Sequence, residues 1–148
     1  MWEKPCLPFF RPCAPSVREK VKHFFILPQT ITGTVAQEAF HILREKGLKF
    51  KVTAITAKEK LCFQDTPECT PEKCPYAKGH FDRVNDAVYE LWTTEEVYSR
   101  EVIRAHAEKW QVCPFEMSLE LSVWMDAVIC DYNYVFDPNV YLKRFFGE

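Results

Sequence analysis

A loop that carries three cysteines and no apolar periodicity constrains this sequence more than any other feature. Residues 62–76 contain Cys62, Cys69 and Cys74 in a C-x6-C-x4-C spacing, together with three prolines. Because this loop cannot be ordered by a core of its own, it needs another source of order, such as a bound metal. A fourth cysteine, Cys113, follows where two helices are expected to meet. We therefore predict a metal centre on these cysteines.

Cysteine usage favours metal binding over disulfides. The chain has seven cysteines, and its N-terminal region is interrupted by four prolines and by charges, so it does not resemble a signal peptide. We therefore expect a reducing, cytoplasmic location, where clustered cysteines bind metal more often than they form disulfides. Cys130 lies in an apolar stretch and fits an ordinary buried thiol. Cys6 and Cys13 have no matched partners.

The spacing leaves the identity of the metal open. Zinc fingers favour paired C-x2–4-C knuckles, and this chain has no C-x2-C pair. Zinc bound by Cys62, Cys69 and Cys74 with either His80 or Cys113 is one alternative. A [4Fe-4S] cluster tolerates irregular spacing with one distant cysteine better. Two of the cysteines precede a proline and an aromatic residue, so the backbone beside the sulfur is restricted and a ring can shield the site.

Apolar periodicity outside the loop predicts an α/β fold. Residues 21–27 and 50–54 are expected as strands with a helix at 34–46 between them, and such units usually build parallel sheets. After the loop, the predicted elements are a helix at 81–92, a second helix from a capping box at 93–96 to about 110, a third from Pro114, a buried strand at 127–130 and a short helix opened by Asp137-Pro138.

Composition limits the functional classes. With 148 residues, 47% of them hydrophobic, the chain is long enough for one globular domain. A formal net charge of −2 provides no general attraction to nucleic acid, so any such contact needs a local basic patch. No apolar run approaches the roughly 20 residues that span a bilayer, and we expect no membrane partner. No catalytic motif such as H-E-x-x-H or G-x-S-x-G is present.

The order of the motifs resembles a known family. The segments CPYAKGHFDRVNDAVYELW, QVCPFEMSL and DAVICDYNYVFDP, placed after the cysteine loop, resemble the iron–sulfur DNA helicases of the DinG/XPD type. The resemblance extends over residues 21–146. It implies a partial RecA-like parallel sheet interrupted by a mainly helical insertion, with a [4Fe-4S] cluster on Cys62, Cys69, Cys74 and Cys113.

The resemblance also divides the chain. Residues 1–20 are an irregular lead-in, 21–60 part of a motor domain, 61–115 the iron–sulfur insertion, and 116–148 a return to the motor domain that ends before the DEAH strand. The family binds ATP and Mg²⁺ with a G-x-x-x-x-G-K-[ST] loop and that acidic strand, and these 148 residues contain neither. We therefore expect a helicase fragment that does not hydrolyse ATP alone.

Basic and aromatic residues beside Cys74 predict a contact with single-stranded or forked DNA, because charges bind phosphates and rings stack on bases. A solvated loop and helix start explains the same pattern about equally well. The resemblance places a second contact in residues 27–34, although relatives usually carry basic residues there. The candidate residues are Tyr76, Lys78, His80 and Arg83, with Thr30 and Thr32 in the second segment.

For the full enzyme, the resemblance implies ATP-driven 5′→3′ unwinding of DNA in repair or replication. The remainder of the helicase is then a further expected partner of this chain. Two alternatives stay open: a zinc-binding structural module without enzymatic role, and a truncated gene product that no longer works. Metal content separates the iron–sulfur hypothesis from the zinc-binding one.

Overall fold

The computed structural model describes residues 23–27 and 30–137, and it is a mixed α/β structure dominated by helices. None of the described helices combines the length and the apolar character needed to cross a membrane. The elements are β1 (His23–Leu27), α1 (Thr30–Glu45), β2 (Val52–Ala54), α2 (Lys58–Leu61), α3 (His80–Thr94), α4 (Arg100–Trp110), α5 (Pro114–Ser122), β3 (Ala127–Asp131) and α6 (Asn133–Phe136).

A three-stranded parallel sheet in the order β1-β3-β2 joins distant parts of the chain. Residues 127–130 form its central strand, and alternate side chains of a strand point to opposite faces of the sheet. Ala127 and Ile129 pack against α1, whereas Val128 and Cys130 pack toward α5 and α6. Both faces are therefore buried, which explains the unbroken apolar run. The predicted α/β fold with parallel strands is confirmed, and Cys130 is a buried core thiol.

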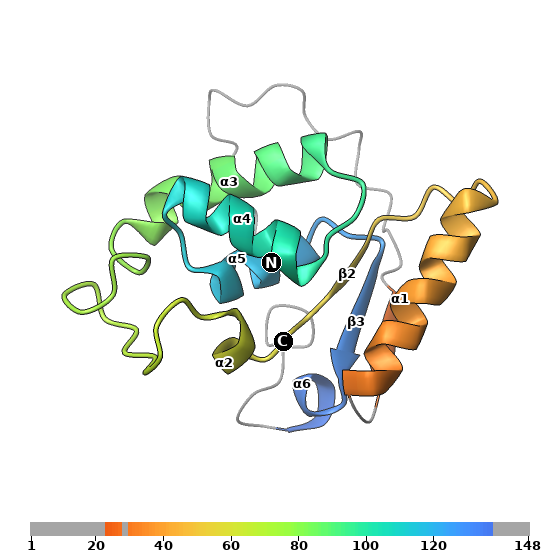
Figure 1. Ribbon diagram of the computed structural model, residues 1–148, viewed down its shortest axis with the longest axis horizontal. Coiled ribbons are helices and arrows are strands. Elements are labelled where there is room, and N and C mark those ends of the chain that lie inside the picture. The colour runs from red at the N-terminus through yellow and green to blue at the C-terminus, as the bar shows by residue number, and fades with distance from the viewer. Residues whose placement is uncertain (1–22, 28–29, 138–148) are drawn as a thin grey trace, which may run out of the picture.

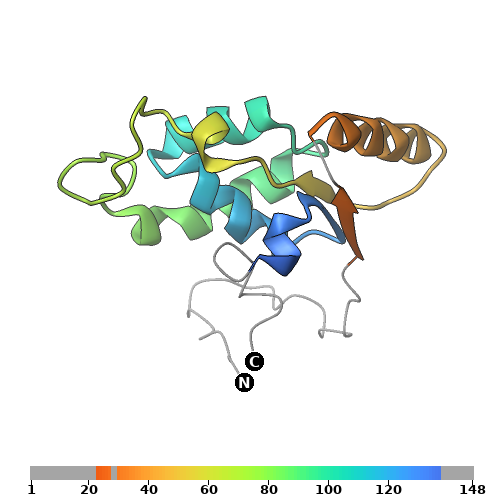
Figure 2. The ribbon, with the colours of Figure 1, turned by 90° about the horizontal axis from the view of Figure 1, so that it is seen from below.

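Helices α3, α4 and α5 form a second unit beside the sheet, on the side away from α1 (Figures 1 and 2). Each helix buries one face in a shared apolar core, as expected for amphipathic helices. The core residues are Val84, Ala87, Val88, Leu91, Tyr98, Ile103, Ala107, Val112, Met117, Leu121 and Met125. This packing fixes the start of α3, at which the cysteine loop ends.

The junction between α3 and α4 differs from the predicted capping box at 93–96. Thr93 and Thr94 belong to the last turn of α3, where their hydroxyls donate to carbonyls one turn earlier. Helix α4 begins at Arg100, with the Ser99 side chain as its N-cap. The predicted helix start after Thr93 was wrong, because threonine hydroxyls can bond within a helix as well as cap one.

Other boundaries also differ. Helix α1 begins at Thr30, earlier than the predicted residue 34, and the short helices α2 and α6 were not predicted. The third predicted helix does begin at Pro114, in the first-turn position that proline favours. Some predictions fall outside the described residues. These are the first two residues of the strand predicted at 21–27, all but Asp137 of the helix predicted from Asp137-Pro138 onward, and Cys6 and Cys13.

Candidate functional site

The long loop between α2 and α3 (Figure 1) carries three of the four candidate ligands, and the fourth lies at the start of α5. Cys62 caps the C-terminus of α2, Cys113 precedes α5 as its N-cap, and Cys69 and Cys74 lie in the loop between α2 and α3. All four are free thiols; Cys74 is buried and Cys69 is exposed. Within the described residues, no three His, Cys, Asp or Glu side chains are grouped closely enough to hold one metal ion. The ligand set therefore stays a prediction.

Lys58 approaches two of these cysteines from α2. A hydrogen bond to Cys69 raises the pKa of Lys58; burial opposes this effect, and the nearby Cys113 and Glu116 add to it. The ammonium also lies 5.9 Å from the centre of the Phe115 ring. The Lys58 ammonium thus interacts electrostatically with two cysteines that are far apart in sequence. It would offset part of the repulsion between their thiolates.

Cys113 combines partial burial with backbone support. Burial raises the pKa of its thiol, while the amides of Glu116 and Phe115 and the charge of Lys58 act in the opposite direction. Its own amide donates to Nδ1 of His80 over 3.2 Å, which ties the start of α5 to the start of α3. A half-buried thiol in this setting becomes a thiolate more readily when a cation binds beside it. The donor chemistry at Cys113 therefore fits a metal.

Two of the predicted DNA-contact residues have structural partners inside the helical unit. His80 is only 4% exposed, and it accepts the hydrogen bond from Cys113. Arg83 donates to the carbonyls of Lys78, Trp110 and Gln111, so it holds the end of α4 against the start of α3. Gln111 is left-handed at φ 51°, and its carbonyl gains a charged donor in this way.

The other predicted DNA-contact residues lie on two different elements. Lys78 is exposed, whereas Tyr76 is half-buried against Phe63, with 4.5 Å between the ring centres. Thr30 and Thr32 lie in the first turn of α1, and their side chains are outside the described part. The structure therefore brings Tyr76 and Lys78 together on the cysteine loop and places the two threonines on a different element.

Comparison with protein-family models shows to which family the chain belongs. The DEAD_2 family model matches residues 38–144, which is more than two thirds of the chain and includes all four candidate cysteines. The chain belongs to the DEAD_2 family. The match supports membership of the DEAD/DEAH-type helicases, and with it nucleic-acid and nucleotide binding in general terms. A search among curated proteins finds no match.

The helicase resemblance inferred from the sequence is thus confirmed at the level of DEAD/DEAH-type helicases. The iron–sulfur type, the polarity of movement and the path of DNA stay predictions.

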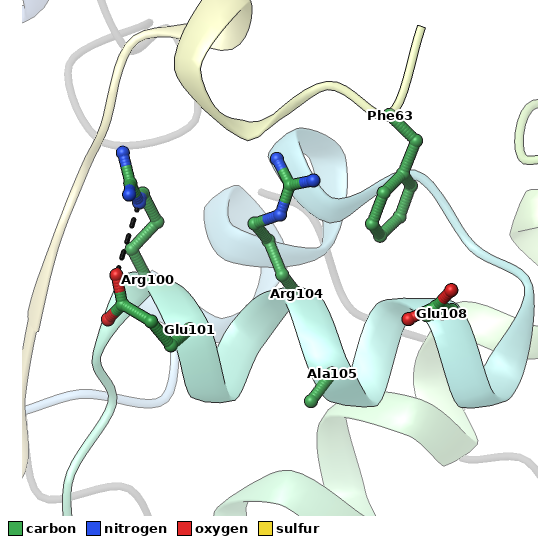
Figure 3. A pocket seen from close by; sticks show the side chains of 6 residues that line it. All are labelled: Phe63, Arg100, Glu101, Arg104, Ala105 and Glu108. Carbon is green, nitrogen blue, oxygen red and sulfur yellow. Dashed lines mark hydrogen bonds and ion pairs between the residues drawn. The ribbon is translucent and has the colours of Figure 1, made fainter.

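The DEAD_2 domain also has a shallow cavity of about 390 Å³ that sequence reasoning missed (Figure 3). Its lining comes from α4 and from the start of the cysteine loop: Phe63, Arg100, Glu101, Arg104, Ala105 and Glu108. The available signal was the four-residue spacing of Arg100 and Arg104, which places two positive charges on one face of a helix. The basic residues predicted to contact DNA lie beside Cys74 instead.

Proposed function

We propose that this DEAD_2 chain is the iron–sulfur-bearing part of the first motor domain of an ATP-dependent 5′→3′ DNA helicase. A [4Fe-4S] cluster would be held by Cys62, Cys69, Cys74 and Cys113. The carrying observation is that these four free thiols lie within the helicase-family match, three of them on one loop and Cys113 near the Lys58 ammonium that also bonds to Cys69. When bound, the cluster would supply a four-point cross-link and a redox centre.

The loop between α2 and α3 supports this proposal because little else orders it. Residues 65–73 are all exposed. Its contacts include a turn in which Cys74 donates to the Thr70 carbonyl and an exposed ion pair between Lys73 and Glu68. An exposed ion pair contributes about 0–1 kcal/mol, whereas structural metal binding supplies on the order of 10 kcal/mol. A metal centre would therefore dominate the stability of this loop.

The parallel sheet with α1 would be part of a RecA-like motor domain, and residues 61–115 its insertion. Helix α5 packs on α3 and α4 and also reaches the sheet, so it would connect the two. ATP and Mg²⁺ would bind to motifs that these 148 residues do not contain, so ATP hydrolysis is assigned to the remainder of the enzyme. The thiolate ligands favour a reducing, cytoplasmic location.

The DNA contact of the cysteine loop would use Lys78 and Tyr76, which lie at its end. His80 and Arg83 would hold the end of the loop in place and not touch DNA themselves, since their polar atoms already bond to the Cys113 amide and to three backbone carbonyls. Single-stranded or forked DNA is the expected partner because an exposed lysine and a tyrosine ring combine phosphate binding with stacking.

Metal analysis combined with DNA binding tests the proposal. Protein purified without oxygen should contain about four irons and four sulfides per chain and show the visible absorbance of a [4Fe-4S] cluster. One zinc per chain without sulfide would instead support a zinc-binding structural module. Absence of any metal would support a truncated, inactive gene product. The metal-loaded chain should also bind fluorescently labelled single-stranded or forked DNA. Absence of binding would contradict the nucleic-acid part of the proposal.

The Lys58→Met variant should lose its cluster faster than the parent protein. A hydrogen bond between charged groups contributes about 1.5–3 kcal/mol, so loss of the ammonium beside Cys69 should speed bleaching of the visible absorbance in air about tenfold. Methionine retains most of the length and apolar character of the stem. Lys49→Met, in an exposed position before β2, is the matched control. Equal bleaching rates in both variants would show that Lys58 does not support the cluster.

A further inference from the structure

Two arginines of α4 point toward the same side of the shallow cavity (Figure 3). Arg100 lies in the first turn of α4 and Arg104 in the next, so their Cα atoms are about 6 Å apart along the helix axis. The loop residue Phe63 also lines the cavity and lies against Arg104. The cavity lining thus contains two guanidinium groups together with the carboxylates of Glu101 and Glu108, and none of these residues is a candidate ligand of the metal centre.

Arg104 is held in a fixed direction. Its Nη1 donates to the carbonyls of residues 60, 61 and 62 at 3.4, 3.0 and 3.3 Å. The centre of its guanidinium lies 4.7 Å from the centre of the Phe63 ring. Because a guanidinium is planar and rigid, anchoring one nitrogen also orients the others. Arg104 therefore presents a positioned positive charge at the cavity wall.

Glu101 occupies the place of an anion beside Arg100. Arg100 Nε and a Glu101 carboxylate oxygen are 3.3 Å apart. Hydrogen bonds from its own amide and from Ser99 lower the pKa of the Glu101 carboxyl, at a helix N-terminus that favours negative charge. The side chains of Arg100 and Glu101 are 48% and 72% exposed, so their pairing is weak. A stronger external anion can therefore take the place of Glu101.

We propose that the Arg100–Arg104 face of α4 binds the sugar–phosphate backbone of a nucleic-acid strand, with Glu101 as a built-in competitor for the phosphate. The inference rests on the proposed function only in that the chain binds nucleic acid. Guanidinium groups match phosphate oxygens in a two-pronged geometry. A strand offers consecutive phosphates to both arginines, whereas a single small anion meets one of them.

The contact is to the backbone and not to the bases. The Phe63 ring has Tyr76 at 4.5 Å and the Arg104 guanidinium at 4.7 Å from its centre, so its stacking capacity is already used. Contacts to phosphate carry no direct sequence information. Binding on this face is therefore independent of base sequence, and it uses other side chains than the contact proposed for Lys78 and Tyr76.

Substitutions with opposite expected effects test the proposal. Dissociation constants are measured by fluorescence anisotropy on the metal-loaded full chain, with a labelled mixed-sequence single strand and a salt series. Arg100→Gln should weaken binding about threefold to tenfold and reduce the salt slope by about 0.7, the value for one phosphate contact on a single strand. Glu101→Gln should tighten binding by a similar factor, because the competing carboxylate is gone. Circular dichroism checks that both variants fold.

Two controls distinguish this site from a general effect of charge and from the contact at Lys78. Lys49→Gln removes one positive charge from an exposed position before β2 and should leave the affinity unchanged. The α4 site is overturned if the parent protein binds DNA and Arg100→Gln has the same affinity as Lys49→Gln. It is also overturned if Lys78→Gln alone weakens binding. In both cases the proposed function stands. If neither the parent nor Glu101→Gln binds, the α4 site and the nucleic-acid part of the proposed function are both overturned. If inorganic phosphate displaces DNA at matched ionic strength, the α4 site binds single small anions and the proposal of a strand-binding site is overturned.

Discussion

The Cys113→Ser variant should retain almost no iron or sulfide, against about four of each in the parent protein. A serine hydroxyl stays protonated near neutral pH and cannot replace a thiolate ligand. Serine is also a favourable N-cap residue, so α5 should form as before. The loss would therefore come from the metal centre and not from a broken helix. Without its cluster, the exposed segment 65–73 should exchange its amide hydrogens rapidly and become sensitive to proteases.

Metal content and hydrogen exchange on the anaerobically purified variant check this result. Cys130→Ala is the matched control, because Cys130 is a core thiol of β3 and its removal should leave the iron content unchanged. Full iron in Cys113→Ser would remove Cys113 from the ligand set. Retention of one zinc in the variant would instead favour the alternative set in which His80 is the fourth ligand.

The Lys51→Met variant should lower the free energy of unfolding by about 2 kcal/mol. The Lys51 ammonium donates to the Trp92 carbonyl at 2.6 Å and to the Tyr98 hydroxyl at 2.8 Å. It also lies 4.5 Å from the centre of the Trp92 ring. Hydrogen bonds of a charged group and a cation–π contact each contribute about 1–3 kcal/mol. Burial, which lowers the pKa of Lys51, offsets part of this gain.

This contact matters because Lys51 directly precedes β2, whereas Trp92 lies in the last turn of α3 and Tyr98 in the segment that follows it. Its loss should therefore loosen the helical unit from the sheet. Urea unfolding followed by tryptophan fluorescence measures the effect, with Lys49→Met as the exposed control two positions earlier. Equal midpoints for the two variants would show that the ammonium adds nothing to the junction. Tyr98→Phe should reproduce part of the loss, since its hydroxyl donates to the Glu95 carbonyl at 2.8 Å.

Local sequence signals predicted the parts of the fold that depend on nearby residues. The apolar run 127–130 indicated a buried strand, which the structure shows to be covered on both faces, and Pro114 indicated the start of α5. The signal failed at residues 93–96, because the same threonines that cap one helix can bond within another. The difference between the two uses depends on where α4 can pack, and that is not a local property.

The candidate site shows the same division. Cysteine spacing and proline positions can nominate ligands, because a metal requires thiols within reach of one another. Charge and aromaticity beside Cys74 could not show that His80 and Arg83 already have partners in the helical unit. Nor could they show that Arg100 and Arg104 of α4 border a cavity. A side chain's availability depends on neighbours that the sequence places far away.

The sequence by itself determined the α/β class, the buried strand at 127–130, the start of α5 and the unusual cysteine loop, because these depend on apolar spacing and backbone restrictions within a few residues. Only the tertiary structure decided which charges are used internally and which are presented to a ligand. The Lys51 amide, for example, donates to the carboxylate of Asp126, 75 residues away, over 2.9 Å. Such pairs form because packing brings their elements together. The apolar periodicity of one segment does not indicate which distant segment will lie beside it.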